Sequence, residues 1–161
     1  MLVSRIVPDA DIDLVHADNA GGMIQAVEHL IELGHRRIGL IGMNDRISTG
    51  QHRINGYVEA LARHDIAFDP TLLMTGIPSR ETGAHQVQTL LDEPGPPTAT
   101  ACFNDVVAFG AMLGLRARGL EPGVDFSVVG SDDIADSVLW WPALTSVSIS
   151  RPRIGQAAVD P

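Results

Sequence analysis

One segment in the second half of the chain constrains the fold more than any other part of this sequence. A short apolar run at 98–103 ends at the polar pair Asn104 and Asp105, a helical segment follows, and a second apolar run occupies 126–130. Strand, helix and strand in this order form a βαβ unit, in which the two strands are parallel and the crossover is right-handed. Polar residues follow both strands, at 104–105 and at 131–133. Because ligands bind at the carboxyl ends of parallel strands, these residues line a candidate site.

The rest of the chain repeats this alternation of strands and helices. Further strands are predicted at 38–42, where the apolar run is continuous, and at 72–76 and 144–149, and a shorter strand candidate lies at 12–17. Apolar residues at helical spacing predict helices between the cap at 18–19 and Gly34, and at 51–63, 79–92 and 105–118. The predicted fold class is therefore α/β: a doubly wound parallel sheet of about five strands with helices on both faces.

Composition and charge exclude several classes of function. The 161 residues suffice for one domain's core, and the net charge is −9, with arginine as the only basic residue type besides histidine. A chain with so few basic residues lacks the clustered positive surface that grips nucleic acid. No run is long and apolar enough to span a bilayer, and the amino terminus does not have the pattern of a signal peptide. The single cysteine, Cys102, is expected to be a packed, inert thiol, which fits a cytoplasmic location.

The sequence lacks the common motifs for catalysis, cofactors and metals. It contains no G-x-G-x-x-G, no H-E-x-x-H and no paired cysteines, so we expect neither a cofactor nor a metal. Asp132 and Asp133 are adjacent carboxylates, but neighbouring residues of an extended chain point in opposite directions and do not form a catalytic pair. We expect no enzymatic activity, although a small α/β enzyme stays open as an alternative on the strength of a polar cleft alone.

Three hydrogen-bonding side chains are the candidates for ligand binding. Arg53 lies near the start of its predicted helix, while Asn104 and Asp132 follow two of the predicted strands. The forked guanidinium and carboxylate groups can each bridge two neighbouring hydroxyls, which is what a sugar presents. The alternatives are structural: Asp105 is expected to cap the helix that it opens, Asn104 could serve the same end, and Arg53 could be a surface arginine.

At these residues the sequence resembles the lactose-repressor (LacI/GalR-type) family of bacterial transcription regulators. The resemblance extends in order from about residue 3 to the end and is carried by these pieces: DN at 18–19, HLIELGHRRIGLIG at 29–42, RINGY at 53–57, PPTATACFND at 96–105, GLEPGVDFSVVGSDD at 119–133 and PALTSVSISRPRIGQAA at 142–158. In this family a helix-turn-helix headpiece precedes a two-lobed effector domain that resembles periplasmic sugar-binding proteins of type I. The resemblance implies a remnant of the first lobe at 1–17, the C-terminal effector-binding lobe at 18–147, and a crossover back to the first lobe at 148–161.

The resemblance also implies a function and a set of contacts. A small effector, expected to be a sugar, would lie between the lobes and touch Arg53, Asn104, Asp132 and Thr49, and operator DNA would be bound only through a headpiece that this sequence lacks. Two departures remove aromatic surface: Pro78 stands where many members carry a stacking aromatic, and Ser131 stands where an aromatic often precedes the aspartate. A transport-type periplasmic sugar-binding protein of the same fold is the alternative function.

The helix at 105–118 indicates a homodimer. It is apolar nearly all round, with one stripe expected to pack on the sheet and a second stripe that includes Phe109 and Leu113. Because a chain of this size is not expected to bury the helix on both sides, the second stripe is predicted to form a dimer interface together with Leu139 and Trp140 of a later loop. The family resemblance implies the same interface. The alternative is that the loop folds over the helix within one monomer.

Overall fold

The predicted parallel sheet is confirmed by a computed structural model, which describes residues 2–3 and 14–159. Five strands form one sheet in which every neighbouring pair is parallel. Their order across the sheet is β4 (Leu73–Thr75), β3 (Ile38–Met43), β5 (Ala99–Cys102), β6 (Ser127–Ser131) and β7 (Thr145–Val147). The chain steps from β3 outward to β4 and then returns to the other side of β3 for β5, so the strand order reverses once, as it does in doubly wound folds.

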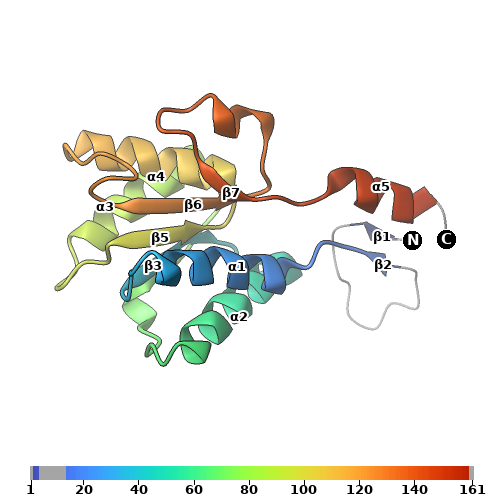
Figure 1. The fold of residues 1–161 in the computed structure, drawn as a ribbon, viewed down its shortest axis with the longest axis horizontal. Helices are drawn as coiled ribbons and strands as arrows, with labels where there is room; N and C mark the ends of the chain where they lie inside the picture. Colours follow the sequence, from blue (N-terminus) through green and yellow to red (C-terminus); the bar gives the residue numbers. More distant parts are fainter. Residues whose placement is uncertain (1, 4–13, 160–161) are drawn as a thin grey trace.

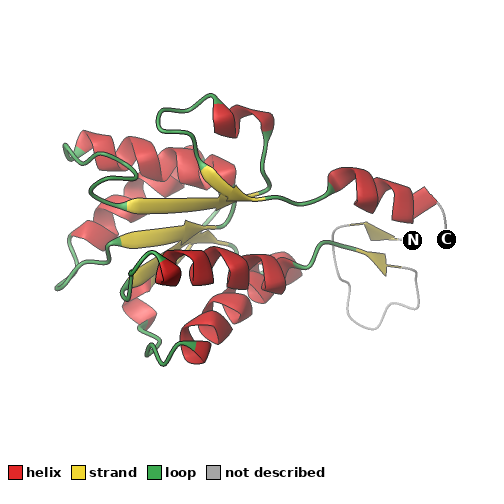
Figure 2. Ribbon diagram, in the orientation of Figure 1, coloured by secondary structure: helices red, strands yellow, loops and turns green. Residues whose placement is uncertain are grey.

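Helices cover both faces of this sheet, as predicted (Figure 1). On one face α1 (Asn19–Glu32) packs against α2 (Ser48–Arg63), and on the other α3 (Arg80–Leu91) packs against α4 (Asp105–Ala117). Two short 3-10 helices, η1 (Pro70–Leu72) and η2 (Ala135–Val138), lie in connecting segments. Figure 2 shows the resulting layers, with the strands between two pairs of helices.

A smaller unit lies beyond the carboxyl ends of the strands (Figure 1). The two-residue strands β1 (Leu2–Val3) and β2 (Leu14–Val15) pair in parallel, and α5 (Arg151–Val159) contacts β2. The strand expected at 12–17 corresponds to β2, and its first two residues lie outside the described part of the chain. None of the described helices is long and apolar enough to cross a membrane.

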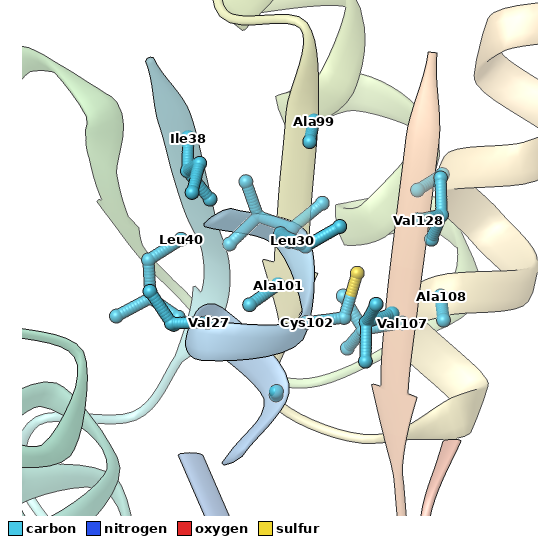
Figure 3. Close-up of a cluster of buried hydrophobic side chains, with 14 of the residues drawn as sticks. Val27, Leu30, Ile38, Leu40, Ala99, Ala101, Cys102, Val107, Ala108 and Val128 are labelled. Carbon is cyan, nitrogen blue, oxygen red and sulfur yellow. The ribbon is translucent and has the colours of Figure 1, made fainter. Parts of the chain in front are cut away.

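The core lies between the sheet and its helices. Figure 3 shows Val27 and Leu30 of α1 directed at the strand residues Leu40 and Ala101, and all four are fully buried. Each leucine buried in this way contributes about 1.5–3 kcal/mol by leaving water. Cys102 belongs to the same cluster, so the prediction of a packed cysteine is confirmed, and burial raises the pKa of its thiol, which agrees with the predicted inertness.

Two of the predicted helix ends are confirmed and one is corrected. The Asp18 carboxylate caps α1 by accepting from the Gly21 backbone N–H at 2.8 Å, and Gly34 ends that helix with a φ of +96°. The prediction that Asp105 caps α4 is wrong. Asn104 is the cap, and its Oδ1 accepts from the Val107 N–H at 3.0 Å. The carboxylate of Asp105 is buried instead and has other partners.

The second apolar stripe of α4 is partly covered by its own chain. Phe109 is fully buried, and the Trp140 ring stacks on it with centroids 4.5 Å apart and planes 5° from parallel. The expectation that Phe109 is left exposed for a partner is therefore wrong, because the loop after β6 folds over the helix within the monomer. Leu113 and Leu139 are exposed, at 46% and 79% of their surfaces.

Candidate functional site

Arg53 is a buried arginine at the carboxyl-end side of the sheet. The helix α2 begins at Ser48, three residues earlier than the sequence predicts, so Arg53 lies in its second turn. Only 5% of its surface is exposed. The alternative of a surface arginine is therefore excluded, and a charge buried this deeply requires partners.

Three groups surround the guanidinium of Arg53. Its Nε donates to Asn19 Oδ1 at 3.2 Å, and its Nη2 donates to Asp132 Oδ1 at 3.3 Å. The ring of Phe103 lies beneath the guanidinium, with 4.7 Å between Cζ and the ring centroid, so a cation–π contact fixes its plane. Arg53 thus joins the start of α1, the end of β5 and the end of β6.

The surroundings of Arg53 keep its guanidinium charged but leave one of its nitrogens without a hydrogen-bond partner among the described residues. Burial lowers the pKa of the Arg53 guanidinium, while the Asp132 charge, its hydrogen bond and then the Asp105 charge act to raise it. An arginine stays protonated under such opposing influences because its ordinary pKa is so high. Among the buried side-chain atoms of the described residues, Arg53 Nη1 is the one without a hydrogen-bond partner. The cluster therefore holds one buried N–H donor that no described residue satisfies.

Asp132 sits on an unusual turn directly after β6. Asp132 and Asp133 adopt φ angles of +111° and +48°, a region that non-glycine residues seldom occupy. The backbone N–H of Asp132 donates to the Val147 carbonyl at 3.0 Å, which ties the turn to β7. Strained backbone of this kind clusters at ligand sites, where it directs a side chain that regular structure could not.

Asn104 and Thr49 each lie at the start of a helix that follows a strand, Asn104 between β5 and α4 and Thr49 in the first turn of α2 after β3. Asn104 uses its oxygen to cap α4, so the structural alternative for that oxygen is what the structure shows. The same amide also carries two donors, so capping by Oδ1 is compatible with ligand binding by Nδ2. Thr49 is half-buried one turn before Arg53 on α2, and residues four apart share a helix face. Arg53 and Asp132 are thus in direct contact, while Asn104 and Thr49 lie at the starts of α4 and α2.

Two hollows open at this side of the molecule. The first, of about 460 Å³, lies between α1, β7 and α5, and its lining residues include Asn19, Arg53, Ser131 and Arg153. The second, of about 440 Å³, lies beyond the ends of β3 and β4 and is lined by residues 44–46 and 75–77. Either volume accommodates a small polar ligand.

Sequence reasoning missed two residues of this cluster, Asn19 and Phe103, and it placed Asp105 at the candidate site without identifying its partners. The sequence indicates Asn19 only as part of the cap at 18–19, and it indicates Asp105 as a polar residue at a strand end and as a helix cap. Phe103 directly precedes Asn104, and its position just after β5 was the available signal for a side chain near the polar strand ends. Elsewhere, in place of the stacking aromatic, Pro78 is half-buried just before the α3 cap Ser79.

Comparisons with known proteins identify the family. The sequence model of the periplasmic binding protein-like domain matches residues 27–160. The chain belongs to this family. The curated relatives are repressors: the HTH-type transcriptional repressor CytR of Escherichia coli is 36% identical over 159 residues, and PurR of Haemophilus influenzae is 34% identical over 160. These alignments cover 99% of this chain but only 47% and 48% of the relatives.

Solved structures of LacI-family regulators have the same fold as this chain. A LacI-family regulatory protein from Chloroflexus aggregans superposes with a TM-score of 0.92 at 33% identity, over 98% of this chain and 58% of that one. The transcriptional regulator CelR in complex with cellobiose gives 0.90 at 33% identity, over 96% and 48%. The resemblance to LacI-type regulators is thereby confirmed. The chain spans about half the length of the curated relatives that it matches.

Proposed function

We propose that residues 18–147 form the second lobe of the effector-sensing domain of a LacI-type transcription regulator. The observation that carries the proposal is the buried Arg53, held between Asn19 and Asp132 at the carboxyl ends of the strands. The related sequences are repressors rather than enzymes, which supports a role in sensing rather than in catalysis.

The proposed effector is a sugar. Arg53 Nη1 and the amide of Asn104 supply donors, and the Asp132 carboxylate supplies acceptors, which suits a ligand with neighbouring hydroxyls. The structurally similar CelR was solved with cellobiose, a ligand of this class. Thr49 is proposed as a further contact from α2.

The proposed mechanism is a population shift between lobe arrangements. Residues 1–17 and 148–161 are assigned to the connection with a first lobe, and the effector would stabilise the closed arrangement of the two. That arrangement would alter how headpieces outside these 161 residues meet operator DNA in the cytoplasm. The net charge of −9 supports placing DNA contact outside this lobe.

Calorimetry with a panel of mono- and disaccharides tests the proposal. The titrations use the 161-residue chain and a version in which a LacI-type first lobe completes the cleft. We expect saturable binding of one class of sugar by the two-lobed version, and weaker binding by this chain because it supplies half of the contacts. A two-lobed protein that binds no sugar in the panel contradicts the proposed effector class.

We also propose that two copies of the chain associate through the face of α4 that carries Leu113 and through the loop with Leu139 and Trp140. Leu139 and Leu113 are exposed large apolar side chains on neighbouring elements, while Trp140 is half-buried against Phe109. Phe109 supports the interface from below rather than anchoring it. A two-fold contact of standard size would bury about 800 Å² on each partner.

A Leu139→Glu variant is expected to raise the dissociation constant of this dimer at least roughly tenfold, because a charge at the centre of an apolar interface loses its hydration. Val124→Glu is the matched control, since Val124 is equally exposed in the loop before β6. Sedimentation velocity of the wild type and both variants at tens of micromolar measures the effect. The dimer is refuted by a monomeric wild type or by equal changes in the two variants.

A further inference from the structure

The carboxylate of Asp105 is buried at the first turn of α4, where the sequence predicts a helix cap at the edge of the candidate site. Only 1% of the residue is exposed. It packs against β6 so closely that a Cβ on Gly130 would lie 2.3 Å from Asp105 Oδ1. The amino-terminal end of α4 favours a negative charge at this position. Even so, a carboxylate removed from water needs hydrogen-bond donors.

The two oxygens of Asp105 bind different segments of the chain. Oδ2 accepts from the Ile134 backbone N–H at 2.8 Å and from the Ser137 hydroxyl at 2.9 Å, and so holds the loop that leads into η2. Oδ1 accepts from the Ser146 hydroxyl of β7 at 2.5 Å. Asp105 is therefore hydrogen-bonded through Oδ2 to the loop and through Oδ1 to the last strand of the sheet.

The hydrogen bond between Asp105 Oδ1 and Ser146 connects Asp105 to the proposed effector site. Ser146 Oγ donates to Asp105 and at the same time accepts from the backbone N–H of Asp133 at 3.0 Å. Asp133 is the second residue of the turn at positive φ, and Asp132, the first, contacts Arg53 at 3.3 Å. A backbone that occupies this region persists only when its surroundings hold it there. The hydroxyl of Ser146 is thus the link between a fixed helix terminus and the turn that directs Asp132.

We propose that Asp105 and Ser146 are positioning residues of the effector site, which they act on through the turn at Asp132 and Asp133. This inference rests on the proposed function for its consequence, which is effector affinity. Asn104, the neighbour of Asp105, caps the same helix. One helix terminus therefore sets two of the effector contacts, Asn104 directly and Asp132 through Ser146.

The hydrogen bonds of the two oxygens allow a matched test, because a serine hydroxyl bonded to each oxygen can be removed by one substitution. Ser146→Ala removes the bond to Asp105 Oδ1 and the acceptor for Asp133, whereas Ser137→Ala removes only a bond to Oδ2. Both variants cost the carboxylate one donor, and Ser146→Ala also leaves the Asp133 N–H without its acceptor, so exchange at Asp132 is compared with that of core amides within each variant. Thr145→Ala controls for change within β7, because Thr145 is an exposed residue of that strand.

The readout is amide hydrogen exchange of Asp132, measured by NMR on the 161-residue chain. The Asp132 N–H donates to the Val147 carbonyl and not to a serine, so its exchange reports the turn itself. Relative to core amides such as that of Leu40, exchange at Asp132 is expected to accelerate about tenfold in Ser146→Ala. It should stay within about threefold of the wild type in Ser137→Ala and Thr145→Ala.

Equal acceleration in all three variants, or none in Ser146→Ala, overturns the positioning role. In the two-lobed version we expect Ser146→Ala to weaken binding of the sugar found by calorimetry about tenfold, with Ser137→Ala within about twofold of the wild type at similar melting temperature. Equal affinities for these two variants also count against the inference. Absence of sugar binding refutes the proposed effector class instead, and the exchange measurement then still decides whether Ser146 holds the turn.

Discussion

An Arg53→Met variant is expected to bind the effector roughly 10-fold to 150-fold more weakly than the wild type, a loss of about 1.5–3 kcal/mol for hydrogen bonds to a charged group. Methionine keeps most of the length of the side chain and its contact with the Phe103 ring. It removes the forked donors, including the Nη1 that no described residue satisfies. Calorimetry with the two-lobed version and its sugar measures the change.

The same variant is expected to unfold at nearly the same denaturant concentration as the wild type. Losing the contacts to Asn19 and Asp132 is unfavourable, but removing a buried cation with an unsatisfied N–H is favourable, so the net change should stay within about 1 kcal/mol. A residue retained for binding shows this separation of affinity from stability, whereas a structural ion pair would not.

Arg63→Met is the control on the same helix. Arg63 pairs with Glu59 and Glu28 on the exposed face of α2, away from the cluster around Arg53. Its replacement should leave sugar affinity unchanged. If Arg53→Met binds as tightly as Arg63→Met, Arg53 does not contact the effector. If Arg53→Met instead unfolds, the buried arginine is a structural element of the lobe.

The sequence predicted the sheet well because its signals there are local. The strands β3 and β5 are apolar almost without interruption, and Gly and polar turns bound them, a pattern typical of buried parallel strands. The cap at Asp18 and the left-handed Gly34 likewise depend on neighbouring residues only. Such features can be recognised along the chain without knowing what packs against them.

The site was predicted less completely because its contacts are long-range. The contact of Arg53 with Asp132 joins residues 79 positions apart, and the roles of Asp105 and Ser146 depend on segments 41 apart. Periodicity placed Phe109 on an outward stripe of α4, but only the structure shows that Trp140 covers it. The choice between Asn104 and Asp105 as the cap also depended on partners elsewhere, since Asp105 has three donors from the loop and β7.

The layer formed by α3 and α4 leads to the prediction with the largest effect on stability. These helices approach so closely that a Cβ on Gly110 would lie 2.0 Å from the Arg80 carbonyl oxygen, and one on Gly83 would lie 2.1 Å from the Val107 carbonyl oxygen. Backbone atoms cannot rotate away as side chains do, so an added methyl group must push the helices apart. Gly110→Ala is therefore expected to destabilise the chain by about 2–3 kcal/mol, measured by urea unfolding.

Gly155→Ala is the control, and it is not expected to lower the stability of the chain. Gly155 is a helical residue of α5, and no atom lies within 4 Å of the position that a Cβ would take there, so alanine should be neutral or stabilise the helix by up to about 1 kcal/mol. A Gly110→Ala variant as stable as the wild type would mean that the two helices can separate without loss.

The double variant Gly83→Ala/Gly110→Ala tests the physical cause of that loss. Both glycines lie in one seam, where each Cβ would meet the backbone of the opposite helix. If the cost comes from separating the helices, the first substitution has already opened the space that the second requires. The double variant should then be less destabilised than the sum of the two single variants, with a coupling of about 1 kcal/mol or more. Additive costs would show instead that each methyl group is accommodated by its own local distortion, and that α3 and α4 do not move as rigid bodies.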